Sequence, residues 1–490
     1  MMKIKYQIPR NLDLIKISGT QKRIIFTVLL TIVLSCQKKE KENIDQISIS
    51  SEIDRFLSET GIPSVSFVLI KDGKVFEKGA RGYSNLKKKV KVDTATYFNH
   101  GSNFKAVTST AIMQLYERGL LDIDAPINDY LLKPFKNFDP TQPITARHLM
   151  SHQSGIPTSV ILNKLWHFGK DLSFDEILEG VVPNAVPEEK FQYANDGFVL
   201  LAKLIEDITE QSYEDYITEN ILEPLGIHTI GYVTPTPEMV ENMALPYHTR
   251  YNRAYPTHQL IVPQYPCGSV YLTPTEMSKF LVMHLNMGTY QGKSILKKES
   301  VEAMHTSNIK AGDDYWYGLG FALEEIDGTK YTFHQGSLPG YVARHQMDFE
   351  SGSAVYVSMN VSASSLQAQQ ILVLQNFLMD YVKGNPLEKM EIPLEEGLLD
   401  VSKPSAFDLS EYVGNYKIGG TTFYFTIENN GGQLVLINPI GERFRVESLS
   451  KEEFFLTTEN ENITFERENG SISALFFGSG ESKYRAIKER

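Results

Sequence analysis

The chain has 490 residues, 42% of them hydrophobic, and a formal net charge of −12 at pH 7. This length exceeds what one ordinary core holds and predicts two domains, while the apolar fraction excludes a mainly disordered protein. Residues 1–36 carry a net charge of +5, so the remainder carries −17. Such an acidic body argues against binding to nucleic acid or to anionic membrane surfaces.

The N-terminal segment has the pattern of an export signal. Residues 24–35 are uncharged and follow two basic residues, and they are too short for a bilayer span, which needs about 20 apolar residues. Residues 33–36, Val-Leu-Ser-Cys, resemble the lipobox of bacterial lipoproteins, in which the cysteine is lipidated. The alternative is an ordinary export signal or short anchor with an incidental cysteine.

We therefore expect residues 1–36 to be a lipoprotein signal peptide with lipidation at Cys36, and residues 37–49 to be a polar tether. The protein would then be exported in a bacterium and anchored to a membrane by its lipid alone, facing the periplasm. Cys267 is the one other cysteine. It predicts no disulfide framework and is expected to be a small buried residue.

A β-hairpin and a long helix follow the tether. Residues 64–70 and 74–80 are β-prone runs that flank a Lys-Asp-Gly turn signal. From residue 106 an apolar stripe predicts a buried helix that ends at Gly119. Ser102 and Lys105 stand at the start of this helix, on one face of one turn.

This Ser-x-x-Lys spacing suits an activated nucleophile, because an amine in a desolvated site is able to take the serine proton. The same spacing also begins at Ser35, Ser84, Ser294, Ser307 and Ser448. Only Ser102 enters a long helix from a loop, so the local pattern favours Ser102.

The middle of the chain is helical. His148 and His152 lie four residues apart, as zinc pairs do, but Leu149 stands where a zinc protease has Glu. We expect both histidines to be structural and predict no metal site. Tyr193 and Asn195 then lead into an apolar-striped helix. A tyrosine at such a junction is usually a core aromatic, yet it also suits the second proton carrier of a Ser and Lys site.

A second β region follows, with strands over residues 331–336, 342–349 and 354–359 and a closing helix over 365–383. Strands at both ends with helices between them predict an α+β domain, an antiparallel sheet packed by helices, over residues 50–383. Residues 384–408 read as a linker. Residues 409–490 contain short strands separated by Asn and Gly turns, which predict a separate small all-β barrel or sandwich.

Three short motifs occur in a defined order: Ser102-x-x-Lys105, then Tyr193-x-Asn195 after 91 residues, then His334-x-Gly336 after a further 141. With their flanking segments they resemble the β-lactamase-related serine hydrolases, a family of class C β-lactamases, D-alanyl-D-alanine carboxypeptidases, D-aminopeptidases and esterases. The resemblance covers about residues 50–383. The C-terminal part is similar to the lipocalin-like module appended to many members.

The resemblance implies a role for each motif. Ser102 would be the nucleophile, Lys105 and Tyr193 would share the acid and base work, and Asn195 would bind substrate. His334 and Gly336 would belong to the substrate-binding strand. The backbone N–H groups of Ser102 and Ser337 would form the oxyanion hole.

The sequence departs from the family pattern at three places. His334 occupies the position of the lysine in Lys-Thr-Gly, and a histidine of ordinary pKa, about 6.5, is mostly neutral at pH 7. Arg344 would supply the missing positive charge, or would form a salt bridge on the strand face. Ala194 stands where Ser is usual, and Pro187-Glu188 stands where Pro-Gly is common.

We therefore expect a serine hydrolase that forms an acyl-enzyme on Ser102 and cleaves an amide or ester, with D-amino-acid or peptidoglycan-like substrates included. Its partner would be a small molecule or short peptide, without a cofactor. The alternatives are a true β-lactamase, a non-catalytic protein that captures such ligands, and a protein whose β-module is the functional part.

Overall fold

The computed structural model describes residues 48–157, 172–257, 262–395, 408–418, 424–437, 443–456, 461–477 and 484–489. Cys36, the predicted signal peptide, most of the tether and residues 396–407 of the linker lie outside these residues. Within the described ranges, no helix combines the length and the apolar character that a bilayer crossing requires.

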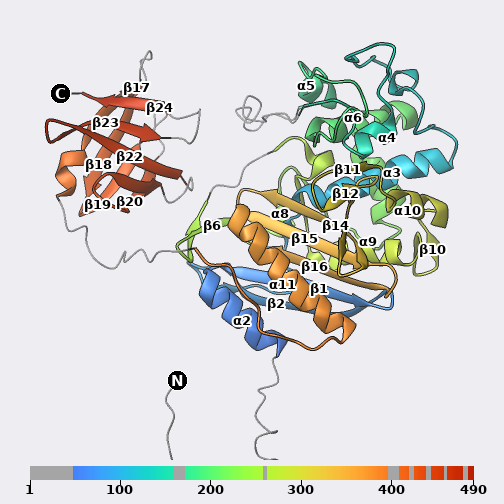
Figure 1. The fold of residues 1–490 in the computed structure, drawn as a ribbon, viewed down its shortest axis with the longest axis horizontal. Helices are drawn as coiled ribbons and strands as arrows, with labels where there is room; N and C mark the ends of the chain where they lie inside the picture. The colour runs from blue at the N-terminus through green and yellow to red at the C-terminus, as the bar shows by residue number, and fades with distance from the viewer. Residues whose placement is uncertain are drawn as a thin grey trace, which may run out of the picture. The chain divides into compact units, whose positions relative to one another are not determined.

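A nine-stranded antiparallel sheet is the centre of the larger domain (Figure 1). Its strands, in sheet order, are β11 (Ile309–Lys310), β12 (Tyr315–Tyr317), β13 (Ala322–Ile326), β14 (Thr329–Leu338), β15 (Tyr341–Asp348), β16 (Ser353–Met359), β1 (Ser64–Lys71), β2 (Lys74–Asn85) and β3 (Val90–Lys91). The first and last parts of the domain therefore meet in one sheet, where β1 pairs with β16. Every residue of β15 and β16 is buried, because helices cover both faces of these central strands.

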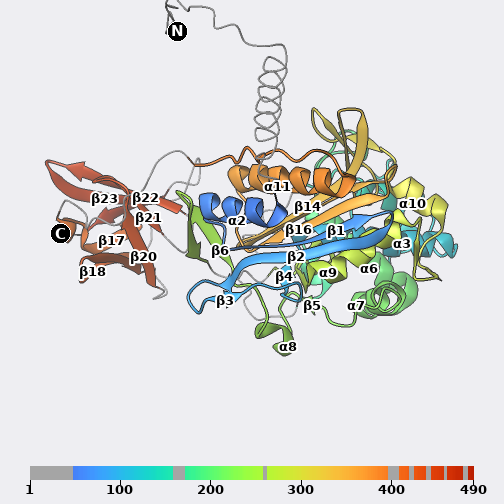
Figure 2. The ribbon, with the colours of Figure 1, turned by 90° about the horizontal axis from the view of Figure 1, so that it is seen from below.

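Two layers of helices enclose the sheet (Figure 2). The helices α2 (Ile49–Thr60) and α11 (Ser365–Lys383) cover one face, and α9 (Pro274–Leu285) lies on the other. The remaining helices are α3 (Lys105–Glu117), α4 (Ala146–Met150), α5 (Phe174–Leu178), α6 (Asn195–Thr209), α7 (Tyr213–Ile217), α8 (Pro237–Val240) and α10 (Lys298–Met304). The remaining strands of this domain are β4 (Phe98–Asn99), β5 (Gly231–Tyr232), β6 (Tyr247–Arg250), β7 (Arg253–Pro256), β8 (Val270–Leu272), β9 (Thr289–Tyr290) and β10 (Lys293–Ser294).

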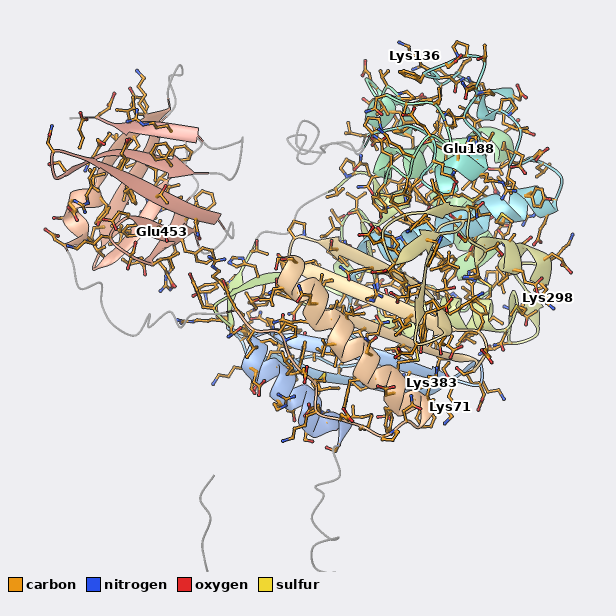
Figure 3. All side chains as sticks on the ribbon, in the orientation of Figure 1. Lys71, Lys136, Glu188, Lys298, Lys383 and Glu453 are labelled. Atoms are coloured by element: carbon orange, nitrogen blue, oxygen red, sulfur yellow. The ribbon has the colours of Figure 1, made fainter. Side chains whose placement is uncertain are left out.

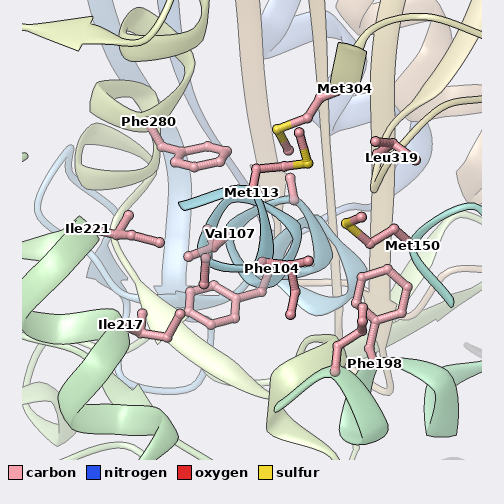
Figure 4. Packing of buried hydrophobic residues seen from close by; sticks show 14 of the residues in the cluster. Phe104, Val107, Met113, Met150, Phe198, Ile217, Ile221, Phe280, Met304 and Leu319 are labelled. Carbon is pink, nitrogen blue, oxygen red and sulfur yellow. The ribbon is translucent and has the colours of Figure 1, made fainter. Parts of the chain in front are cut away.

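The helix α3 runs through the core of this domain. Its residues from Lys105 to Leu115 are all buried. In Figure 4 the side chain of Met113 on α3 lies beside Met304 of α10, and the same buried cluster contains Val107 of α3 and Phe198 of α6. A helix that is buried on all sides is held by its neighbours, so groups at its N-terminus are fixed in position.

The C-terminal strands form a closed antiparallel barrel. They are β17 (Gly414–Ile418), β18 (Tyr424–Asn430), β19 (Gln433–Ile437), β20 (Arg443–Ser448), β21 (Glu453–Leu456), β22 (Glu461–Glu468), β23 (Ser471–Phe477) and β24 (Tyr484–Lys488). Pairing of β17 with β24 closes the barrel. Tyr412 is fully buried in the core of the barrel, with ring centroids of Phe454 and Phe465 at 4.7 and 5.0 Å.

The predicted α+β class with a separate all-β barrel is confirmed, and closure decides between the barrel and the sandwich. Several boundaries differ from the predicted ones. The hairpin strand β2 extends to Asn85, so Ser84 lies within a strand, and β14 continues through Ser337 and Leu338, which were expected to be a turn. The end of β2 is held by pairing with the short strand β3, and the end of β14 by pairing with β15.

Candidate active site

The nucleophile candidate lies on a short 3-10 helix, η1 (Gly101–Phe104), which continues directly into α3. Ser102 is half-buried, whereas Lys105 is completely buried. The Lys105 Nζ donates to Ser102 Oγ at 3.0 Å, to Asn195 Oδ1 at 2.8 Å and to the Cys267 carbonyl at 3.0 Å. Three acceptors match the three donors of an ammonium group, so this buried amine is fully hydrogen-bonded.

The second motif meets the first across the site. Asn195 begins α6, and its side chain reaches Lys105. The Lys105 Nζ also lies 4.8 Å from the ring centroid of Tyr193 and 5.4 Å from that of Phe198. The tertiary structure thus brings together the Ser-x-x-Lys and Tyr-x-Asn residues, which lie far apart along the chain.

The third motif packs its backbone against the nucleophile turn. A Cβ added at Gly336 would lie 2.1 Å from the His100 carbonyl oxygen and 2.6 Å from the Ser102 nitrogen. Gly101 has φ +49°, and a Cβ there would lie 2.5 Å from the Ser337 nitrogen. The backbone nitrogens of Ser102 and Ser337 are therefore neighbours across a contact that only glycines allow.

A fourth segment, which the sequence patterns did not indicate, completes this packing. It is the 3-10 helix η5 (Tyr265–Cys267) with Gly268 after it. Gly268 has φ +151°, and a Cβ there would lie 2.3 Å from the Gly101 carbonyl carbon. Cys267 acts through its carbonyl, while its thiol is buried, donates to the Gln264 carbonyl and has a pKa raised by burial. Every residue has a backbone carbonyl, so the sequence does not predict which carbonyl accepts a hydrogen bond from Lys105.

The Asn103 side chain links the short helix η1, which carries Ser102, to strand β15 of the sheet. Its Nδ2 donates to the carbonyls of His100 at 2.9 Å and Ala343 at 3.1 Å. Its Oδ1 lies 2.8 Å from His345 Nδ1. All these groups are buried. Asn103 is an x position of Ser-x-x-Lys, and its positioning contacts were not predicted.

His334 is buried, and neighbours occupy both of its ring nitrogens. Nδ1 lies 2.9 Å from the Gln335 carbonyl, which accepts only, so Nδ1 carries the proton. Nε2 then accepts from the Tyr317 hydroxyl at 2.7 Å. Burial, with a smaller contribution from the Lys105 charge, lowers the pKa of His334 to about 3.

The expectation that His334 has an ordinary pKa is therefore wrong. A histidine of ordinary pKa would be protonated in mild acid and would then bind an anionic group more strongly. Loss of hydration disfavours the imidazolium, so His334 remains neutral in mild acid as well as at pH 7.

Arg344 forms a salt bridge on the strand face, the second of the two possibilities stated above. Its Nη2 lies 3.0 Å from Glu324 Oε1, and its guanidinium carbon lies 4.1 Å from the Phe333 ring centroid. Burial lowers the pKa of this guanidinium, and the Glu324 carboxylate opposes that shift. Its charge is thus compensated locally.

The two histidines of the possible zinc pair make structural contacts. His148 accepts from the Thr145 backbone N–H at 3.2 Å in a capping box at α4. His152 is buried and accepts from the Ala194 N–H at 3.1 Å, and its ring lies 4.2 Å from the Tyr193 ring. Among the described residues, no group of three or more His, Cys, Asp or Glu side chains is arranged to hold a metal.

The departures at positions 188 and 194 have local explanations. Glu188 has φ +67°, a left-handed conformation that favours glycine. Its carboxylate, 3.2 Å from His148 Nε2, gives the non-glycine residue a compensating contact. Ala194 is the N-cap of α6 and has no capping side chain, which a Ser at this position would supply.

Comparisons with known proteins agree with this geometry. The family model described as Beta-lactamase matches residues 49–374. A putative penicillin-binding protein, PbpX of Bacillus subtilis, is 24% identical over 335 residues, which are 68% of this chain and 79% of PbpX. Protein flp of Staphylococcus aureus is 31% identical over 192 residues, 38% of each chain.

Solved structures of penicillin-binding protein homologues and related enzymes have a similar fold. The octameric penicillin-binding protein homologue from Pyrococcus abyssi has a TM-score of 0.58 and 25% identity, and the alignment covers 90% of this chain and 99% of that one. The D-amino acid amidase from Ochrobactrum anthropi has a TM-score of 0.55 and 21% identity, with 69% and 95% covered, and shares the fold. This chain belongs to the beta-lactamase family of serine hydrolases.

Proposed function

We propose that this protein hydrolyses an amide or ester through an acyl-enzyme on Ser102. The observation that carries the proposal is the hydrogen bond between Lys105 Nζ and Ser102 Oγ, in a site where two carbonyl oxygens hold the other donors of the amine. In the neutral amine, two N–H groups donate to Asn195 and to the Cys267 carbonyl, and the nitrogen lone pair then faces the Ser102 hydroxyl.

In the first step the Ser102 proton passes to the group formed by Lys105 and Tyr193, and Oγ bonds to the substrate carbonyl carbon. The carbonyl oxygen becomes an oxyanion, which the N–H groups of Ser102 and Ser337 would stabilise. The C–N or C–O bond then breaks, and the leaving group takes the proton. Water repeats the sequence on the acyl group and releases Ser102.

The charges near the site favour neutral or amine-bearing substrates over β-lactams. Burial keeps His334 neutral, and Glu324 compensates Arg344. Neither residue supplies the free cation that a penicillin carboxylate would need at this strand. A carboxypeptidase substrate has the same requirement, so amidase or esterase activity fits the site better.

The proposal includes the setting of the enzyme. The segment 1–36 supports export and lipidation at Cys36, with the catalytic domain held at a bacterial membrane through its lipid and facing the periplasm. The acidic mature chain supports a small-molecule or short-peptide partner. Metabolic labelling with an alkyne fatty acid tests the anchor, and Cys36→Ser should abolish the label.

Intact-mass analysis tests the chemistry. The protein is treated with a fluorophosphonate, a p-nitrophenyl ester and a penicillin, and the variant Ser102→Ala is treated in parallel. We expect one fluorophosphonate adduct, mapped to Ser102, turnover of the ester, and little reaction with the penicillin.

An adduct on another serine would overturn the assignment of Ser102. Absence of any adduct or turnover would favour a ligand-capturing protein that has kept the fold. Rapid penicillin turnover would mean that a cation other than His334 or Arg344 holds the carboxylate, and it would make the protein a β-lactamase.

A further inference from the structure

A second cavity lies in the catalytic domain, between α10 and the strands β12, β13 and β14. Its volume is about 910 Å³, within the range of small-molecule sites. None of the predicted site residues lines it. The apolar part of the lining consists of Met287, Val301, Trp316, Leu323 and Phe349. This surface is large enough for an apolar group, and Trp316 is 37% exposed.

The lining of the cavity is rich in acceptors. It includes Glu302, Glu324, Glu325 and Glu350, against Lys330 as its single Lys or Arg side chain. Glu302 lies 3.3 Å from Lys298, the exposed lysine labelled on α10 in Figure 3, and Glu324 is held by Arg344. Lys330 stands opposite Glu325 in the β13 and β14 ladder. Within the described part of the chain, Glu350 has no ion-pair partner.

His305, which also lines the cavity, adds a buried acceptor. Thr110 Oγ1 donates to the Ala106 carbonyl, so it accepts from His284 Nε2 at 3.4 Å. A neutral His284 with its proton on Nε2 accepts at Nδ1, and His305 Nε2 donates to it at 3.0 Å. Burial lowers the pKa of both histidines.

The proton of a neutral His305 is therefore on Nε2, and its Nδ1 is a lone-pair acceptor. This atom is buried and has no partner among the described residues. The Phe349 ring packs 4.5 Å from the His305 ring, and the neighbouring Glu350, an exposed carboxylate, also lines the cavity. A buried acceptor without a donor is costly, and a ligand N–H would remove that cost.

We propose that this cavity is a second binding site, distinct from Ser102, for an organic ammonium ion with an apolar body. The ammonium donates to the acceptors Glu350 and His305, and the apolar body packs on Leu323 and Trp316. Aromatic faces attract cations, so Trp316 favours a charged ligand over a neutral one.

Tryptophan fluorescence tests the proposal, because the chain has only two tryptophans, Trp166 and Trp316. In Trp166→Phe the single remaining tryptophan, Trp316, lines the cavity. This protein is titrated with phenethylammonium, with neutral phenethyl alcohol and with anionic phenylacetate. We expect saturable binding of the ammonium ion and at least tenfold weaker binding of the other two.

Charge variants locate the binding. Glu350→Gln should weaken ammonium binding about tenfold. Glu299→Gln, an exposed carboxylate of α10 outside the cavity lining, removes the same charge and should leave the dissociation constant unchanged. Phosphonylation of Ser102 by a fluorophosphonate should also leave it unchanged.

Four results would overturn the proposal. Equal affinity for the amine and the alcohol would show an apolar site without charge recognition. Equal effects of the two glutamate variants would show a general charge effect. Loss of the fluorescence response after phosphonylation at Ser102 would place the ligand in the catalytic site. A titration without saturation would show that the cavity does not bind the ion.

Discussion

The two ends of strand β14 are built in opposite ways. At the end with His334, Gly336 and Ser337, the strand touches the nucleophile turn through backbone contacts that exclude any side chain at Gly336. At the other end, Lys330 and Thr332 line an open cavity of about 910 Å³. One strand thus passes from close backbone packing to an open cavity.

This difference shows that one strand contributes both to a closely packed backbone arrangement and to the wall of a cavity. The oxyanion hole that we propose needs donors that are fixed before reaction. The close approaches at Gly101, Gly336 and Gly268 hold the backbone at the end of β14 that faces Ser102. The cavity end carries no such contacts, since a Cβ at Gly328 would meet nothing within 4 Å. Substitutions at the two ends should therefore differ sharply in their effect on activity.

The largest contrast is expected between two lysines. Lys105→Ala should lower ester turnover by about a hundredfold or more, the scale of a positioned acid or base, because Ser102 loses its hydrogen-bonded amine. Lys330→Ala, at the cavity end, should leave turnover unchanged. Steady-state kinetics on one p-nitrophenyl ester measures both.

Tyr193 extends this test. Tyr193→Phe should also lose about a hundredfold, and the double variant with Lys105→Ala should lose much less than the product of the two, because the residues act as one unit. Near-normal turnover in a folded Tyr193→Phe would make Tyr193 a core aromatic. Circular dichroism is the control for folding.

The two glycines of β14 and its turn give the next contrast. Gly336→Ala would place a Cβ 2.1 Å from the His100 carbonyl and should cut turnover by about a hundredfold or more, as loss of an oxyanion donor does. Gly328→Ala has open space but φ +78°, so it should cost about 1 kcal/mol of stability and no activity. Similar turnover in the two variants would show that β14 yields to a side chain at position 336.

Acid should lower the free energy of unfolding equally through a buried histidine at each end of β14. The pKa of His334 at one end and of His284 beside the other is lowered to about 3 by burial, while each is about 6.5 in the unfolded chain. Between these values the unfolded state binds more protons, so the free energy of unfolding falls as pH falls from about 6.5 toward 3. Each histidine contributes a slope of about 1.4 kcal/mol per pH unit.

Urea unfolding at several pH values measures this slope. His334→Gln and His284→Gln should each reduce it by the same amount, whatever they do to the absolute stability. An unchanged slope in either variant would mean that this histidine is protonated in the folded protein.

The smallest effect is expected at the cap of α6. Ala194→Ser would supply the missing side-chain acceptor at the helix N-terminus and should raise stability by about 1 kcal/mol. Because Ala194 is buried beside His152 and Tyr193, a loss of stability would show that the site has no room for the hydroxyl. The thermal unfolding midpoint distinguishes the two outcomes.

Much of the fold and part of the site follow from local sequence. Ser102 and Lys105 share one helical turn because their spacing is set by helix geometry, and the helix α11 over 365–383 follows from its cap and apolar stripe. The order of the three motifs resembles that of a known family, and this resemblance predicts that Tyr193 and His334 belong to one site with Ser102. The spacing of the motifs alone does not predict it.

Long-range packing decided the rest. The Cys267 carbonyl, the Asn103 contacts and the glycine approaches act through backbone atoms or through partners more than a hundred residues away, which residue types do not reveal. Burial, which no pattern at His334 predicts, lowers its pKa to about 3. The pairing of Arg344 with Glu324, the closure of the barrel and the cavity beside Trp316 likewise depend on which elements become neighbours, and that is a property of the whole chain.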